Sequence, residues 1–132
     1  MAFLIAADVI VQAERKRLDL DAWLRAHPQE EIRIAAITVA ELWRSAEQAT
    51  GVHRDKRQKF LERALEVFEI VPYSERAAVE HAHLWASLEA TGQRLGPHDM
   101  ILAATALEHG ATLVTFNVRR FTVVPGLTAV AP

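Results

Sequence analysis

The hydrophobic pattern is most continuous between Leu95 and Asn117, where the chain reads LGPHDMILAATALEHGATLVTFN. Pro97 suits the first turn of a helix, because its missing N–H has no partner there in any case. Met100–Leu107 is almost entirely apolar or alanine, so the helix is expected to be buried on most of its surface, and Gly110 is expected to end it. Ala111–Phe116 is an apolar run without alternation, typical of a parallel strand covered on both faces. A buried helix followed by a buried strand is half of a βαβ unit.

Strand and helix patterns alternate along the rest of the chain as well. Thr38 and Glu41 form an [ST]-x-x-E capping box that predicts a helix start, Asp8 is expected to cap an earlier helix, and Gly51 is expected to end the helix after the box. The patterns predict further strands at residues 3–6, 32–37 and 69–71, helices at about 8–14, 20–25, 38–50, 55–68 and 75–90, and at most one short strand in the tail, 121–131. This alternation favours one three-layer α/β domain over residues 1–132 with a mainly parallel sheet, whose strand order the pattern leaves open.

Composition narrows the classes of partner. The chain has 15 basic and 17 acidic residues and a formal net charge of −2, so it lacks the basic surplus of a general nucleic-acid binder, and any such contact must be local. It has no cysteine, which excludes disulfides and thiolate metal sites and favours a reducing cytoplasm. The apolar start FLIAADVIV is interrupted by Asp8 and has no basic leader, so we expect neither a signal peptide nor a membrane span.

Four oxygen-bearing side chains fall at comparable places in the βα pattern: Asp8, Glu41, Asp99 and Asn117. If the strands that precede them are adjacent and parallel, all four converge on one edge of the sheet, where ligand sites of open α/β sheets form. Clustered carboxylates repel one another unless a cation or a proton intervenes, and hard oxygen ligands suit Mg²⁺ or Mn²⁺. Helix caps and turn formers are the alternative explanation of these positions.

Four segments carry a resemblance to a known family: FLIAADVIVQAER, AAITVAELWRS, RLGPHDMILAATALEHGATLVTFNVRRF and VVPGLTAV. In this order the chain resembles the PIN-domain ribonucleases, specifically the VapC toxins of bacterial toxin–antitoxin pairs. The resemblance spans nearly the whole chain and implies a compact α/β/α sandwich. It also implies an endoribonuclease that depends on Mg²⁺ or Mn²⁺, a homodimer, and a VapB-type antitoxin that masks the acidic pocket.

The resemblance assigns roles to individual positions. Glu41, Asp99 and Asn117 match three of the four places of the family's acidic pocket. The resemblance implies that Asp99 is a direct metal ligand and that Glu41 either lies behind the metal ligands or holds a metal-bound water. Asn117 can still offer a neutral oxygen. The family's leading catalytic aspartate falls on Ala6, which has no ligand atom. Asp8 matches a place usually filled by Asn, Ser or Asp, and is expected to be an auxiliary metal contact.

The alanine at position 6 leaves two explanations open. The chain is either a degenerate relative that no longer cleaves RNA, or it carries a deliberate Asp→Ala change that disarms a toxic enzyme; the second is favoured because every other motif is intact. Loss of one electrostatic stabiliser is expected to lower the rate by ~10²-fold or more. The alternative function is a catalytically inactive PIN-like module that binds RNA or a partner without cutting.

Cations and tryptophans supply the remaining candidates. Five basic residues flank the acidic positions in sequence and could hold phosphates, although each could equally be a solvated surface charge: Arg15, Lys16, Arg94, Arg119 and Arg120. We take Arg15, Arg94 and Arg119 as the candidate substrate-binding residues. Core packing is the default expectation for the tryptophans Trp23, Trp43 and Trp85, and the helices around Trp23 and Trp43 are the expected source of a dimer surface.

Overall fold

The computed structural model describes residues 2–132. Strands and helices alternate through these residues, as the pattern predicts. In chain order they form β1 (Ala2–Ile5), α1 (Ala7–Glu14), α2 (Leu20–Ala26), β2 (Glu31–Ala35), α3 (Ala36–Gln48), α4 (Gly51–Val67), β3 (Glu69–Val71), α5 (Glu75–Thr91), α6 (Pro97–Glu108), β4 (Thr112–Val114), the 3₁₀ helix η1 (Val118–Val123) and β5 (Ala129–Val130).

The strands form one sheet in the order β3-β2-β1-β4-β5. Neighbouring strands are parallel throughout, and Leu4 on the central strand β1 lies opposite Arg33 on β2 and Leu113 on β4. The sheet grows to one side from β1 to β3 and to the other side from β4 to β5. The direction of the connections therefore reverses between β1 and β4, and a crevice opens outside the carboxyl ends of strands at such a switch point.

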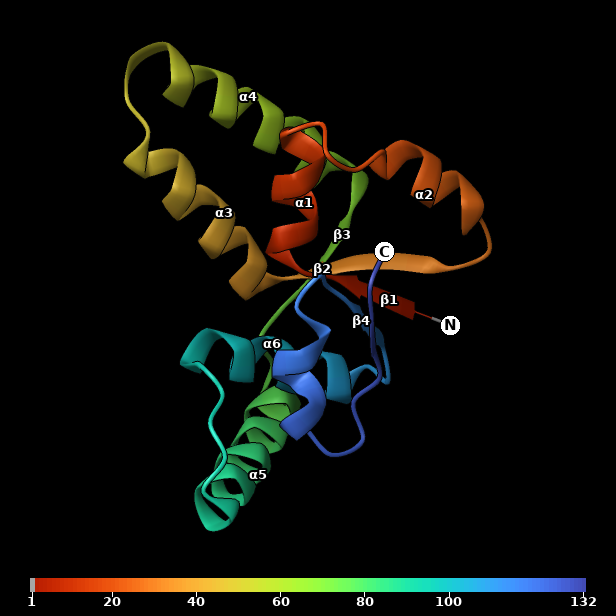
Figure 1. Cartoon of the computed structure of the whole chain (residues 1–132), viewed down its shortest axis with the longest axis vertical. Helices are drawn as coiled ribbons and strands as arrows, with labels where there is room; N and C mark the ends of the chain where they lie inside the picture. Colours follow the sequence, from red (N-terminus) through yellow and green to blue (C-terminus); the bar gives the residue numbers. More distant parts are fainter. Residues whose placement is uncertain (1) are drawn as a thin grey trace.

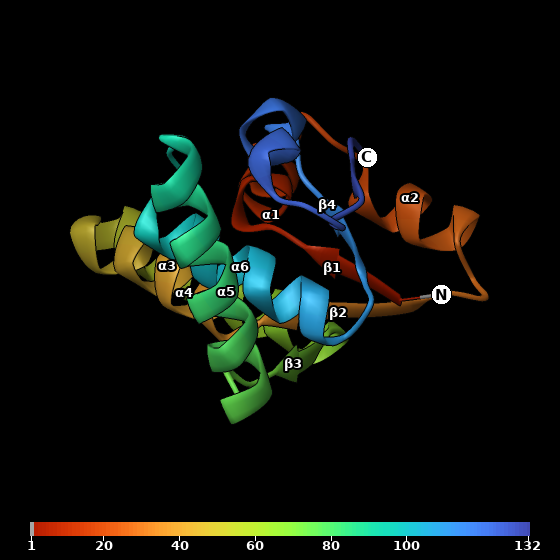
Figure 2. The same cartoon turned by 90° about the horizontal axis from the view of Figure 1, so that it is seen from below.

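Helices cover both faces of the sheet, which makes the domain a three-layer sandwich (Figures 1 and 2). Adjacent residues of one strand point to opposite faces: Leu4 belongs to the core shared with α5 and α6, and Ile5 belongs to the core shared with α1, α3 and α4. Leu113 and Val114 divide in the same way. Both faces of the central strands are buried, which explains why β1 and β4 read as continuous apolar runs rather than alternating ones.

Helix α5 begins and ends as its end residues predict. The Ser74 hydroxyl accepts a hydrogen bond from the backbone N–H of Ala77 at 3.1 Å, which satisfies one of the free donors at the amino end. Gly92 ends the helix in a left-handed conformation with φ +68, which costs glycine little. Pro97 occupies the first turn of α6, also as expected.

Three local predictions were wrong. Helix α3 starts at Ala36, so Thr38 lies inside the helix instead of capping it, and Glu41 lies in the second turn; the chain turns from β2 directly into the helix, without a capping side chain. Gly51 does not end α3, because α4 begins at Gly51 itself, four residues before the predicted start. Asp8 lies in the first turn of α1, and the cap position is Ala6.

Trp23 and Trp43 pack within the chain as expected, whereas Trp85 does not. Trp23 packs within the chain against Phe3 and His27, with ring centroids 5.5 and 4.2 Å away, and Trp43 packs against the α1/α3/α4 core. Both side chains therefore pack within one chain, and the dimer surface expected around them stays a prediction. Trp85 on α5, expected in the core, is instead 53% exposed.

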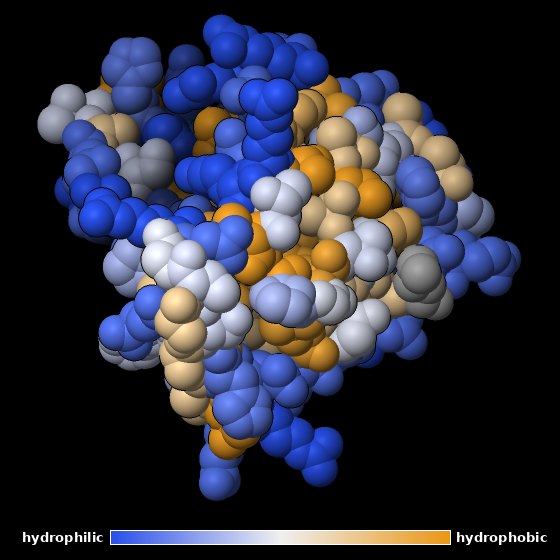
Figure 3. Space-filling model, turned by 60° about the horizontal axis from the view of Figure 1, so that its bottom comes forward, coloured by the Kyte–Doolittle hydropathy of each residue, from blue (hydrophilic) through white to orange (hydrophobic). Residues whose placement is uncertain are grey.

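The surface combines a hydrophobic patch with a hydrophilic surround. On the face drawn in Figure 3, hydrophobic residues gather in the middle and hydrophilic residues lie around them.

Among the helices of residues 2–132, none combines the length and the apolar character needed to cross a bilayer.

Candidate active site

The predicted acidic residues meet at the crevice between β1 and β4. A small cavity of about 70 Å³ is lined by Ala6, Asp8, Glu41 and Asp99, together with Thr115 just after β4 and two side chains of η1. The backbone N–H of Ala6 donates to the carbonyl of Val114 at 3.0 Å, which ties the end of β1 to the end of β4. Parallel strands end at the same edge, and this is why residues more than 30 positions apart come together here.

Asp8 braces the cavity wall. Its carboxylate accepts hydrogen bonds from the Thr115 hydroxyl at 3.1 Å, the Phe116 backbone N–H at 2.8 Å and the Asn117 side-chain amide at 3.2 Å. The Thr115 hydroxyl in turn accepts from the Asn117 backbone N–H at 3.0 Å. These bonds use much of the acceptor capacity of Asp8, so its position favours holding the segment after β4 over binding an ion directly.

Asn117 joins the cluster through Asp8. Because its amide nitrogen donates to Asp8, its amide oxygen remains to accept from water or a cation, with the amide orientation assigned from this network. Thr115 was missed in the sequence, although a signal was present. It is, with Thr112, one of two polar residues in the mostly apolar run after Gly110, and it is 1% exposed.

The Glu41 carboxyl titrates abnormally. Burial raises its pKa above the ordinary value of 4.5, and the nearby Asp99 and Asp8 charges add to the rise, whereas His98 and Arg120 oppose it. Desolvation and like charges both disfavour the ionised form. Glu41 therefore holds a proton more readily than a solvated glutamate. A raised pKa of this kind suits a carboxyl that accepts a proton from water and releases it again.

Replacing Glu41 with Gln is expected to raise the melting temperature of the metal-free protein at neutral and alkaline pH. A group whose pKa is raised on folding stabilises the fold fully below its unfolded pKa, and this contribution is lost as the pH rises through the folded pKa. The gain from Glu41→Gln should therefore vanish at about pH 4. Thermal unfolding across this range measures it, with Glu66→Gln on the exposed side of α4 as the control; a gain that does not depend on pH would contradict the assignment.

The predicted substrate-binding cations are not the ones that line the cavity. Arg15, Arg94 and Arg119 are all exposed, at the end of α1, in the loop before α6 and in η1. The cavity is lined instead by Arg120, whose guanidinium lies 3.6 Å from the carboxylate of Asp99. In a 3₁₀ helix each residue is turned by about 120° from the one before it, so Arg119 and Arg120 point in different directions.

The donor set suits a hard cation held by few protein ligands. Asp99 and Glu41 contribute carboxylates, but no three acidic or histidine side chains within residues 2–132 are grouped closely enough to hold a metal ion by themselves. Mg²⁺ is commonly bound through one or two carboxylates, with water and substrate phosphates completing its shell. The residues present therefore fit a Mg²⁺ or Mn²⁺ ion that keeps several of its water ligands.

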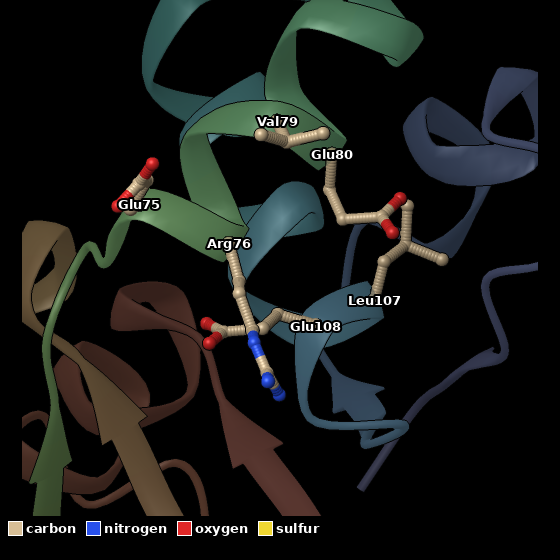
Figure 4. Close-up of a pocket in the computed structure, with 6 residues that line it drawn as sticks. All are labelled: Glu75, Arg76, Val79, Glu80, Leu107 and Glu108. Atoms are coloured by element: carbon tan, nitrogen blue, oxygen red, sulfur yellow. The ribbon is translucent and has the colours of Figure 1, made fainter.

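A larger hollow lies elsewhere. It measures about 450 Å³ and opens between α5 and α6. Figure 4 shows Arg76 and Glu80 reaching from α5 towards Leu107 and Glu108 on α6. Leu107 and Glu108 lie at the end of α6 opposite Asp99, about 13 Å along the helix axis at about 1.5 Å per residue. This hollow is therefore separate from the strand ends and from the acidic cavity.

Comparison with known proteins agrees with this geometry. The family model described as PIN domain matches residues 5–127. The chain is 29% identical to "Ribonuclease VapC1" of Rickettsia felis over 96% of this chain and 93% of that protein. It is 31% identical to "tRNA(fMet)-specific endonuclease VapC" of Salmonella typhimurium over 71% and 70% of the two chains.

A solved structure gives the same result. The chain superimposes with a TM-score of 0.92 at 25% identity on a chain of the crystal structure of VapBC2 from Rickettsia felis bound to a DNA fragment from their promoter, covering 100% of this chain and 99% of that one. The resemblance drawn from the sequence motifs is thereby confirmed. The chain belongs to the PIN-domain family, within its group of VapC ribonucleases.

Proposed function

We propose that this protein is a divalent-metal-dependent endoribonuclease toxin of a type II toxin–antitoxin pair, whose activity is reduced by the alanine at position 6. The observation that carries the proposal is the convergence of Asp8, Glu41 and Asp99 on one cavity at the carboxyl ends of β1 and β4. The named ribonuclease activity of the VapC relatives supports the reaction class.

In the proposed reaction a bound Mg²⁺ or Mn²⁺ supplies charge neutralisation and lowers the pKa of water at the scissile phosphate. Asp99 is the residue placed to bind the ion, since it opens α6 and points into the cavity. Glu41, whose pKa is raised by burial and by Asp99, orients the attacking water and accepts its proton. Asp8 keeps the Asn117 amide oriented at the rim through its hydrogen bond.

Ala6 is what makes the activity slow. Its side chain is 5% exposed and lines the cavity, so the place of the family's first carboxylate is filled by a methyl group. With one carboxylate fewer in the cavity, the attraction between the protein and the cation offsets less of the free energy needed to remove water from the cation. A non-cleaving RNA- or partner-binding module is the second candidate, and the same alanine favours it.

Cleavage of a mixed RNA substrate by the Ala6→Asp protein, with Mg²⁺, with Mn²⁺ and with EDTA, tests the proposal. Cleavage that requires the metal supports a nuclease. Tight RNA binding without cleavage by both the alanine and the aspartate proteins would favour the binding module.

We further propose a VapB-type antitoxin as partner. The related solved structure is that of VapBC2 from Rickettsia felis bound to a DNA fragment from their promoter. This chain also has a hollow of about 390 Å³ between α1, α2 and α4, lined largely by apolar side chains such as Leu24, Phe60 and Val67. An apolar segment of a partner fits such a surface. Because RNA and a newly made antitoxin are both met in the cytoplasm, we place the toxin there.

A homodimer is the proposed state without antitoxin, and α5 is its proposed interface. The Tyr73 hydroxyl and the His81 ring lie 2.8 Å apart, and His81 stacks on Trp85 at 5.6 Å. Tyr73 and Trp85 are 45% and 53% exposed. An exposed row of aromatic rings already held in place loses little freedom on association, and aromatic residues are enriched in interfaces.

Replacing Trp85 with Glu is therefore expected to convert a dimer into a monomer. Light scattering at micromolar concentration should give twice the chain mass for the unchanged protein and a single chain mass for the variant. Val52→Glu, at a position 68% exposed on α4, is the matched control and should remain dimeric. A monomeric mass for the unchanged protein would refute the proposed dimer.

A further inference from the structure

A cation of the chain itself lies at the acidic cavity. Arg120 lines the cavity together with Asp99 and Glu41. Its guanidinium carbon lies 6.0 Å from the centroid of the Phe121 ring, and Phe121 is buried in the core at 2% exposure. The buried Phe121 thus fixes the backbone next to Arg120. The Arg120 guanidinium extends to 3.6 Å from the Asp99 carboxylate.

The ion pair between Arg120 and Asp99 is loose enough for another cation to replace Arg120. The Asp99 side chain is only 18% exposed, but the Arg120 side chain is 56% exposed. At 3.6 Å the two charges attract each other without a hydrogen bond of normal length. An ion pair with one solvated partner contributes little stability, so Arg120 can leave Asp99 at small cost.

A divalent metal ion and the Arg120 guanidinium compete for the Asp99 carboxylate. A divalent ion at Asp99 carries twice the charge of the guanidinium and repels it. A guanidinium displaced from Asp99 remains tethered at the cavity mouth, where its planar set of donors matches two oxygens of a phosphodiester. Lysine offers a point charge and lacks this two-pronged geometry.

We propose that Arg120 is a tethered cation that neutralises Asp99 when no metal is bound and moves to a phosphate of the RNA when a divalent ion takes Asp99. It is a positioning residue for the substrate, and it links metal binding to RNA binding at one site. The inference rests on the proposed nuclease function, because it requires both a metal at Asp99 and an RNA substrate.

The first experiment measures Mn²⁺ affinity by electron paramagnetic resonance of the free ion. Arg120→Ala is expected to bind Mn²⁺ about two- to fivefold more tightly than the unchanged protein, because the competing charge is gone. Arg120→Lys should remain close to the unchanged protein, since it keeps the charge. Arg25→Ala, which removes an exposed charge on α2, is the control and should change nothing.

The second experiment measures binding of a fluorescent single-stranded RNA by anisotropy in saturating Mn²⁺. The chain with Ala6 suits it, because slow cleavage leaves the RNA intact. Arg120→Ala should weaken binding about tenfold, the loss expected for a charged hydrogen bond, and Arg120→Lys should recover only part of it. Without metal, where Arg120 is held by Asp99, the same substitution should change RNA binding less than twofold.

The outcomes separate the two proposals. Mn²⁺ binding that is equal in Arg120→Ala and in the unchanged protein would overturn the role of Arg120 and leave the nuclease intact. An equal loss of RNA binding in Arg119→Ala would also overturn it, in favour of the cation suggested by the sequence. No Mn²⁺ binding by either the unchanged chain or the Ala6→Asp chain would overturn the nuclease proposal itself. Circular dichroism of each variant confirms that the fold is retained.

Discussion

Replacing Ala6 with Asp is expected to raise the rate of RNA cleavage by about 10²-fold or more, the effect of regaining one electrostatic stabiliser. The end of β1 already places this side chain in the cavity, at 5% exposure and beside Asp99, so a carboxylate there needs no change of backbone. The added charge should also tighten Mg²⁺ binding. Single-turnover cleavage of a labelled RNA, with and without EDTA, measures the gain.

Ala40→Asp is the matched control for this gain. Ala40 precedes Glu41 on α3 and is exposed, so it adds one carboxylate near the cavity but outside it, and no increase in rate is expected. Without metal, Ala6→Asp should lower the melting temperature, because a fourth carboxylate joins Asp8, Glu41 and Asp99 at a partly buried site, and Mg²⁺ should restore it. Equal cleavage by the alanine and the aspartate proteins would show that position 6 is not part of the site.

Replacing Asp99 with Asn in the Ala6→Asp protein is expected to lower cleavage again by about 10²-fold or more. Asparagine keeps the size of the side chain but loses the charge that holds the cation. The stability of the metal-free protein should change little, because relief of repulsion from Glu41 offsets the loss of the solvated contact with Arg120. Cleavage rates and thermal unfolding are measured on the same preparation.

Asp55→Asn, on an exposed turn of α4, is the control for Asp99→Asn and should leave the rate unchanged. If cleavage persists after Asp99→Asn and also in EDTA, then neither the acidic cavity nor a bound metal performs the reaction. Such a result would place the chemistry at another site and in another reaction class.

The sequence by itself determined the elements and the family. Ala111–Phe116 reads as a strand buried on both faces because its residues must pack against helices on each side, and β4 is found there as the residues Thr112–Val114. Pro97 marked the start of α6 because its missing N–H suits the first turn of a helix. The resemblance also marked Ala6 as the position of the family's first carboxylate, a prediction that the Ala6→Asp experiment tests.

Helix boundaries were predictable only where local chemistry decided them. Thr38 looked like a cap, but the turn from β2 into α3 is set by how both elements pack on the sheet, so the helix starts at Ala36 and the Thr38 hydroxyl is buried. Trp85 was expected in the core because it lies on an amphipathic helix. Its exposure follows from the packing of α5 against α6 (Figure 1), which buries Leu84 and Leu88 and leaves Trp85 on another side of the helix.

The composition of the site was decided by tertiary structure. The order β3-β2-β1-β4-β5 brings β1 and β4 together, and only then do Asp8 and Thr115, which are 107 positions apart, form a hydrogen bond. Arg119 and Arg120 are equivalent as charges in the sequence, yet the turn of η1 directs Arg120 towards Asp99. Residue types and their spacing predict which chemical groups the chain can offer. Long-range strand pairing and the direction of each side chain decide which of these groups meet in one site. Strand pairing and side-chain direction depend on the whole fold and not on local sequence alone.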